Sequence, residues 1–423
     1  MRMGIHIGTE ASERGNVGAW EREGTRGRAI THLRIYTSTL LLLSCMRTSV
    51  VSAHGEQWLQ YRSANEARQI VGDMGSNYRR ISSGRPQEAV KLPEFKAQPL
   101  FHDWKTPMAT SSGTVWLAFD KSSPSGPYDR LYIDGNANGD LSDDSACQPY
   151  RQESNRSAFG PLKIVFNTAD GPITYHLSVE LRVYSSEQTY CLLTPACWYE
   201  GPVTVGGAKK HCVLIDYNVN AVFNDKSANL GECDRIRIGE KDGRDARYVG
   251  NFIEVDDKLY RPEIARDGAF VLLTEAADVA YGEVRMAESI TSFGAGGVNG
   301  LFLRKPENGV VKLPVGDYRI EHWSIVRNDD RGAKWELQAN PARDPGDFAV
   351  VQDQEKKLPI GEPIYSMAEY RQNGSFYSFN QNLEGRHGER ITLTRNGSQP
   401  PAPRLRIRSR DGAYERALNF EYG

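Results

Sequence analysis

Asp and Asn residues stand at alternate positions in two segments of the sequence, where their side-chain oxygens could bind a metal ion. In LYIDGNANGDLSDD (131–144), Asp134, Asn136 and Asn138 are followed at once by Gly139. This spacing matches the first half of an oxygen-ligand calcium loop, D-x-[DN]-x-[DN]-G. A hard cation such as Ca²⁺ takes about 6 to 8 oxygen ligands, so one short loop must curl around it.

The second segment repeats this pattern further along the chain. VLIDYNVNAVFNDK (213–226) places Asp216, Asn218 and Asn220 in the same order, and Asp225 aligns with Asp143 of the first segment. Internal self-similarity of this kind indicates that one supersecondary unit is used twice.

The loop pattern predicts which atoms would bind Ca²⁺. In the first loop they are Asp134, Asn136, Asn138, the carbonyl of Asp140, and Asp143 or Asp144. In the second loop they are Asp216, Asn218, Asn220, the carbonyl of Val222, and Asp225. Ser145 and Ser227 stand where an EF-hand has its bidentate Glu, so we expect a dissociation constant of about 10⁻⁴ to 10⁻³ M, which suits a structural ion.

The alternative is that both segments are turns, held by Asp and Asn side chains that bond their own backbone. The second loop also has Ala221 where the first has Gly139 at the sharp turn. The presence of two matching copies favours metal binding, more strongly in the first loop. The flanking residues have the pattern of strands, so the helices of an EF-hand are not expected.

Signals of catalysis are weak in this sequence. It contains neither G-x-S-x-G nor H-E-x-x-H. The glycine-rich tract at 292–300 lacks the Gly-Lys-Ser/Thr ending of a phosphate loop. His176 lies in an alternating strand, where a packed or solvent-facing role is favoured, and nothing pairs Asp143 with Asp144 across a cleft. The sequence therefore favours a non-enzymatic protein.

The elements that must position the two loops are short strands. Lys plus Arg number 52 and Asp plus Glu number 54, so there is no basic surface for nucleic acid, and 40 Gly with 20 Tyr favour strands joined by tight turns. We predict an all-β fold of tandem β-sandwich domains, Ig-like or prealbumin-like, with a short N-terminal helix at 56–71.

Five segments follow from these patterns. They are a leader and signal peptide (1–53), an N-terminal helix and linker (54–90), a β-sandwich with both loops (91–268), a small β-sandwich (269–345) and a C-terminal Ig-like β-sandwich (346–423). The repeated K-L-P-[VI]-G-[DE] of VKLPVGDY and KKLPIGEP places Pro and Gly at strand-to-turn junctions.

The N-terminal segment predicts export. Arg34 precedes an apolar run that is too short to span a membrane, and Val51-Ser52-Ala53 fits a signal cleavage site. Cys45 follows a lipobox-like Leu-Leu-Ser, so a lipid anchor there is the alternative to cleavage after Ala53. The polar segment 1–30 is an unusually long extension before such a signal, so an alternative is that translation starts further in, for example at Leu33. The expected location is secreted, periplasmic or in the cell envelope.

The cysteines of the exported part lie in one window of the chain. They are Cys147, Cys191, Cys197, Cys212 and Cys233. Local disulfides fit an oxidising compartment, and one thiol must remain because the number is odd. A zinc site is the weaker alternative, since there is no close C-x-x-C pair.

The chain resembles a loose group of uncharacterised secreted bacterial proteins. The resemblance rests on the D-x-N-x-N-G-D-L-x-D-D loop, the second I-D-Y-N-x-N copy followed by IEVDDKLYRPEIARDG, the KLPVGDY turn and the terminal FEYG, and it covers most of 90–423. It implies the same architecture and export but no activity.

We therefore expect an exported binding or structural protein of the cell envelope with a protein or glycan partner. The alternative is a secreted hydrolase or hydrolase accessory with its site between the first two β-domains. A binding role would need an exposed aromatic platform, for which Trp116, Trp198, Tyr199 and Trp323 are candidates.

Overall fold

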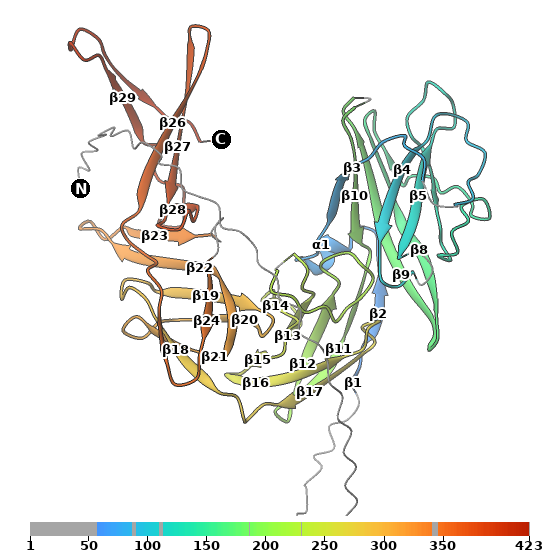
Figure 1. The fold of residues 1–423 in the computed structure, drawn as a ribbon, viewed down its shortest axis with the longest axis horizontal. Helices are drawn as coiled ribbons and strands as arrows, with labels where there is room; N and C mark the ends of the chain where they lie inside the picture. Colours follow the sequence, from blue (N-terminus) through green and yellow to red (C-terminus); the bar gives the residue numbers. More distant parts are fainter. Residues whose placement is uncertain are drawn as a thin grey trace, which may run out of the picture. The chain divides into compact units, whose positions relative to one another are not determined.

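The computed structural model describes residues 57–86, 90–109, 113–185, 187–229, 231–340 and 346–422. The leader, the proposed cleavage site at Ala53 and the proposed anchor at Cys45 lie outside these residues. The described chain is almost entirely β-structure, arranged in several separate antiparallel sheets, which confirms the predicted all-β class (Figure 1). The described residues contain no helix that is long and apolar enough to cross a membrane.

Four sheets hold the strands before residue 276. The first joins β1 (Gln57–Trp58), β17 (Phe270–Glu275), β16 (Lys258–Ile264) and β15 (Ile253–Val255). The second joins β3 (Asn77–Arg80), β10 (Thr189–Pro195), β9 (Gly171–Val183), β8 (Arg156–Thr168) and β7 (Arg151–Gln152). The third joins β14 (Arg247–Tyr248), β13 (Arg235–Gly239), β12 (Ala208–Ile215), β11 (Cys197–Val205) and β2 (Gln60–Ser63). The fourth joins β4 (Leu100–Lys105), β5 (Thr114–Asp120) and β6 (Arg130–Ile133).

These four sheets share one hydrophobic core. Trp104 of β4, Phe166 of β8, Leu214 of β12 and Val271 of β17 all lie within it. Strands that alternate between buried and exposed residues bury one face each, so a second sheet must cover that face. β9 shows this alternation from Tyr175 to Leu181.

The remaining strands form four further sheets. One joins β21 (Val310–Pro314), β18 (Tyr281–Arg285) and β25 (Glu355–Lys357), the last pair being parallel. Another joins β20 (Gly300–Arg304), β19 (Ser292–Gly297), β22 (Gly316–Asn328), β23 (Lys334–Ala339) and β28 (Ile391–Arg395), with β24 (Asp347–Val350) also on β22. Two ribbons consist of β26 (Tyr365–Asn373) with β27 (Phe376–Glu384), and β29 (Arg404–Arg408) with β30 (Glu415–Asn419).

A second hydrophobic core lies among these later strands and includes Phe293, Trp323 and Phe348. The predicted boundary at 268 falls in the turn between β16 and β17, which pair with each other. Strands of the predicted C-terminal domain join sheets that begin before residue 346, because β24 pairs with β22 and β28 with β23. The division into five segments remains a prediction.

The N-terminal helix predicted over 56–71 is largely wrong. The helix α1 covers Ala67–Val71 alone, and the residues before it form β1 and β2. Leu59 is buried while Trp58 and Gln60 are exposed, which is the two-residue period of a strand. Tyr61 pairs with Tyr199 of β11, so a distant strand overrides the local helical pattern.

The five cysteines of the described chain are all free thiols, so the expected local disulfides are not formed in this structure. Cys191, Cys197 and Cys212 stand on three successive strands and are fully buried in the core of the first four sheets. They pack there as small apolar side chains.

Candidate functional site

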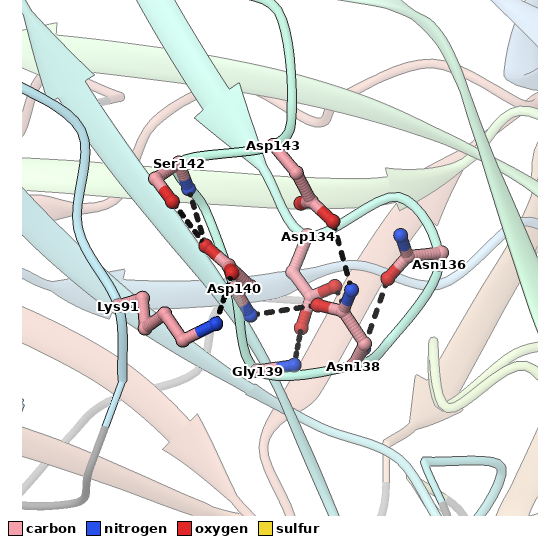
Figure 2. Close-up of polar contacts among 8 residues, drawn as sticks. All are labelled: Lys91, Asp134, Asn136, Asn138, Gly139, Asp140, Ser142 and Asp143. Carbon is pink, nitrogen blue, oxygen red and sulfur yellow. Dashed lines mark hydrogen bonds and ion pairs between the residues drawn. The ribbon is translucent and has the colours of Figure 1, made fainter.

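The first Asp/Asn loop follows β6 and is organised by its first residue, Asp134 (Figure 2). This carboxylate is buried, and it accepts the backbone N–H of Asn138 at 3.0 Å and that of Gly139 at 2.8 Å. Burial raises the pKa of Asp134, while these N–H groups lower it. Asp134 therefore folds the loop around its own side chain.

The predicted ligands Asn136, Asn138 and Asp143 lie on the same loop and are joined by hydrogen bonds. The Asn136 side-chain oxygen accepts the Asn138 N–H at 3.0 Å, and the Asn138 amide Nδ2 donates to Asp143 Oδ2 at 2.9 Å. Asn138 Oδ1 accepts the Asp140 N–H at 2.7 Å. Each carbonyl or carboxylate oxygen has two lone pairs, so one remains after each of these bonds.

Asp140 directs its side chain away from this cluster. Its carboxylate forms an ion pair with Lys91 at 2.8 Å and accepts the N–H and the hydroxyl of Ser142. The hydrogen bond from Lys91 is the main cause that lowers the pKa of Asp140 to about 2. The Asp140 side chain is thus engaged with Lys91 and Ser142, and the proposed ligand from this residue is its carbonyl.

Asp144 closes the loop from the other side. Its carboxylate oxygens accept the Gly135 N–H at 3.3 and 3.4 Å. Burial, together with the charges of neighbouring Asp134 and Asp143, raises the pKa of Asp144 to about 6. Asp134 and Asp143 therefore lie close enough to Asp144 for their charges to act on it.

The second loop has the same hydrogen-bonded frame. Asp216 accepts the Asn220 N–H at 3.3 Å and the Ala221 N–H at 2.7 Å, and Asn220 Nδ2 donates to Asp225 Oδ2 at 2.7 Å. Asn220 Oδ1 accepts the Val222 N–H at 2.8 Å. Each of these bonds has its equivalent in the first loop.

The backbone of the two loops also matches. Ala137 and Gly139 have φ of 55° and 82°, and their equivalents Val219 and Ala221 have φ of 61° and 66°. Few residues other than Gly adopt this left-handed region. The sequence repeat is therefore a repeat of local structure, including two strained positions.

Asp234 is a member of the second loop that the sequence pattern missed. Lys226 stands at the position of Asp144, and Asp234 takes over its part by accepting the Tyr217 N–H at 3.0 Å and the Asp225 N–H at 2.8 Å. Asp234 precedes β13, so it reaches the loop from a separate strand. No local spacing could reveal it, although an Asp at the start of a strand near the loop is a weak signal.

The second loop is more deeply buried than the first. Asp216 and Asp234 have no exposed surface, and Tyr175 donates its hydroxyl hydrogen to Asp216 at 2.8 Å. Burial raises the pKa of Asp216, and burial together with the charge of Asp216 raises that of Asp234. Two close carboxylates without a cation between them disfavour the charged form.

One oxygen of the second loop has no partner. Asn218 Oδ1 is buried and accepts no hydrogen bond, although Asn218 Nδ2 donates to Asp225 Oδ2 at 2.9 Å. This oxygen stands at the second predicted ligand position. An unpartnered buried acceptor beside paired carboxylates fits a site that takes an oxygen-seeking cation.

The described residues contain no group of three or more His, Cys, Asp or Glu side chains arranged to hold a metal ion. A cation in these loops would therefore depend on Asn oxygens and backbone carbonyls as well as carboxylates. Such a ligand set suits Ca²⁺ better than a transition metal, which prefers imidazole or thiolate.

The aromatic residues considered for a binding platform are mostly in the core. Trp198, Tyr199 and Trp323 are buried, and Trp116 is partly buried beside a small cluster around Leu141. The two most exposed of the described aromatic residues, Tyr370 and Phe376, lie instead on the β26–β27 ribbon, where they are 67% and 79% exposed. An aromatic surface forms where strands are not covered by another sheet. Which strands stay uncovered is decided by tertiary packing, so the sequence pattern alone did not locate this surface.

Clefts in the described part of the chain include two that lie among the first four sheets. All residues that line them precede residue 268, so neither cleft combines side chains from the first two predicted β-domains.

Comparisons with protein-family models, with curated proteins and with solved structures found no match to this chain.

Proposed function

We propose that this chain is an exported, non-catalytic binding or structural protein of the cell envelope whose first β-domain is stabilised by Ca²⁺ at its two Asp/Asn loops. The observation that carries the calcium part is the unpartnered Asn218 Oδ1, set in a loop whose hydrogen-bonded frame is duplicated in the first loop. Two copies of one hydrogen-bonded frame indicate that the two loops share a role. The unpartnered oxygen of Asn218 supports a cation as their ligand.

The residues that would hold the ion are those with oxygens still able to accept. In the first loop Asp134, Asn136 and Asn138 would contribute side-chain oxygens, with Asp143 or Asp144 adding charge. In the second loop Asp216, Asn218, Asn220 and Asp225 would do so, with Asp234 adding a further carboxylate. The cation would supply only positive charge, which stabilises the charged carboxylates and cross-links the loop.

Export and a binding role have separate support. Export is supported by the apolar segment after Arg34 and by the site at Ala53. A binding role is supported by the β26–β27 ribbon, where Tyr370, Tyr377 and Phe379 have ring centroids 6.3 to 6.5 Å apart. Clusters of exposed aromatic residues are typical of surfaces that meet a partner.

Equilibrium dialysis of the full chain against radioactive Ca²⁺ tests the calcium part. We expect one ion per loop with a dissociation constant of about 10⁻⁴ to 10⁻³ M. Asp225→Asn should remove binding at the second loop and leave the first. Binding of no ion by the folded protein at millimolar Ca²⁺ would overturn the proposal.

The N-terminus of the mature protein tests export. Mass spectrometry of the protein from a cell-envelope fraction should find either a chain that begins after Ala53 or one acylated at Cys45. An uncleaved, unmodified chain in the cytoplasm would contradict export.

A further inference from the structure

A cleft of about 590 Å³ is lined by residues of which none belongs to either Asp/Asn loop. β2 and β11 form one wall, β8 and β9 form another, and the turn between β16 and β17 adds Asp267. This volume is within the range of small-ligand sites, about 300 to 1,000 Å³.

His176 is held in a fixed position in this cleft. The chain passes from β10 of one sheet to β11 of another at Ala196, whose N–H donates to the His176 carbonyl at 2.9 Å. The Tyr61 hydroxyl lies 2.6 Å from His176 Nδ1. Burial and the charge of Lys163 lower the pKa of His176, so the ring is neutral near pH 7. Since Nδ1 is engaged with Tyr61, Nε2 is the ring nitrogen left for a ligand, as donor or acceptor according to the tautomer.

The other polar groups of the cleft are available to a ligand. Among the described residues, the side chains of Ser63, Lys163, Thr174 and Tyr199 make no hydrogen bond or ion pair with the protein. Asp267 accepts only the Ala269 N–H, at 3.1 Å. The cleft therefore offers three free hydroxyls, one imidazole nitrogen, one cation and one anion.

These groups define the chemistry of the ligand. One Lys and one Asp leave the cleft with no net charge, which disfavours an anion or a cation. The hydroxyls of the cleft can both donate and accept hydrogen bonds, so they match a ligand that itself carries several hydroxyl groups. The apolar side chains of Pro172 and Ile173 offer a surface for the C–H groups of such a ligand. We infer that the cleft between β2 and β9 binds a neutral saccharide, held by His176, Tyr199 and the flanking hydroxyls.

This inference deepens the proposed binding role and rests on it, but not on calcium. Isothermal titration of the full chain with cellohexaose, xylohexaose, chitohexaose and laminarihexaose should give binding to at least one, with a dissociation constant of about 1 mM or tighter. Titrations in Ca²⁺ and in chelator separate the two claims, since a failure of calcium binding leaves the cleft in place. Binding of none of the four sugars would overturn the inference, as would binding of triglycine in their place.

Three variants locate the binding site. Tyr199→Phe removes a hydroxyl that would contact the sugar, and it should weaken binding by about 2- to 10-fold. Tyr61→Phe keeps the ring but releases His176, so it should weaken binding similarly and shift the ¹⁵N resonance of His176 Nδ1. Tyr184→Phe removes an exposed tyrosine hydroxyl outside the cleft and is the control, with unchanged affinity. Equal affinities of Tyr199→Phe, Tyr61→Phe and the control, at unchanged melting temperatures, would show that the sugar binds elsewhere.

Discussion

At the scale of single residues, the first Asp of each loop has a structural role that is independent of any ion. Asp134 and Asp216 each accept backbone N–H groups from the residues four and five positions later. A buried N–H that loses its acceptor keeps the cost of its desolvation. The first Asp of each loop is therefore needed to shape the loop, whereas the later Asp and Asn residues can serve mainly to bind the ion.

Asp134→Ala should destabilise the protein in both Ca²⁺ and chelator. It leaves the Gly139 N–H without an acceptor and the Asn138 N–H with Asn136 as its one remaining acceptor. We therefore expect a loss of about 1 to 3 kcal/mol in the free energy of unfolding in chelator. Urea denaturation measures this loss. A variant as stable as the wild type in chelator would contradict the role of Asp134 in shaping the loop.

Asp143→Asn separates charge from shape in the first loop. The amide oxygen of Asn can still accept from Asn138 Nδ2, but the negative charge is lost. In chelator the melting temperature should change little, while the rise on adding Ca²⁺ should be smaller than in the wild type. An undiminished rise would exclude Asp143 as a ligand.

At the scale of elements, two left-handed residues bend each loop, and the loops differ in how they meet this requirement. Gly139 serves in the first loop and Ala221 in the second, both with positive φ. A Cβ added at Gly139 would meet no atom within 4 Å. The cost of a side chain there is therefore conformational and not steric.

Gly139→Ala should destabilise the protein by about 1 to 2 kcal/mol, the usual cost of an L-residue in the left-handed region. Chemical denaturation in chelator measures this cost. Since the second loop already has Ala at this position, the variant should still fold. Failure to fold would mean that the first loop depends on Gly for more than its backbone conformation.

Local signals allowed the loops to be predicted from sequence, and non-local contacts explain what was missed. The Asp and Asn spacing is contained within one loop, so it pointed directly to Asp134 and Asp216, whose carboxylates accept backbone N–H groups; their role as ligands stays a prediction. Asp234 enters the second loop from another strand, and β2 takes its conformation from pairing with β11. The cleft around His176 collects residues from five separate segments, which no spacing in the sequence could bring together.

At the scale of the whole described chain, a buried carboxylate links two sheets from different hydrophobic cores. Glu321 of β22 accepts the Tyr248 hydroxyl of β14 at 3.3 Å, and its other oxygen, Oε1, is buried without a partner. Burial raises the pKa of Glu321 to about 7. Folding therefore favours its protonated form.

Stability should fall with rising pH because of Glu321. A carboxyl whose pKa is raised on folding contributes stability below its ordinary pKa, and this contribution is lost as the pH rises through about 7. Glu321→Gln mimics the neutral form, so its melting temperature should exceed that of the wild type at about pH 8 and approach it at about pH 5. A constant difference between the two proteins across this range would contradict a titrating Glu321.

The central claim, that the two Asp/Asn loops are calcium sites that stabilise the fold, is tested most directly by thermal melting of the full chain in millimolar Ca²⁺ and in excess chelator. An ion that binds only the native state raises stability by mass action, so the melting temperature should rise by several degrees in Ca²⁺. The rise should be lost when Asp143→Asn and Asp225→Asn are combined. Identical melting in Ca²⁺ and in chelator would mean that both loops are turns held by their own side chains.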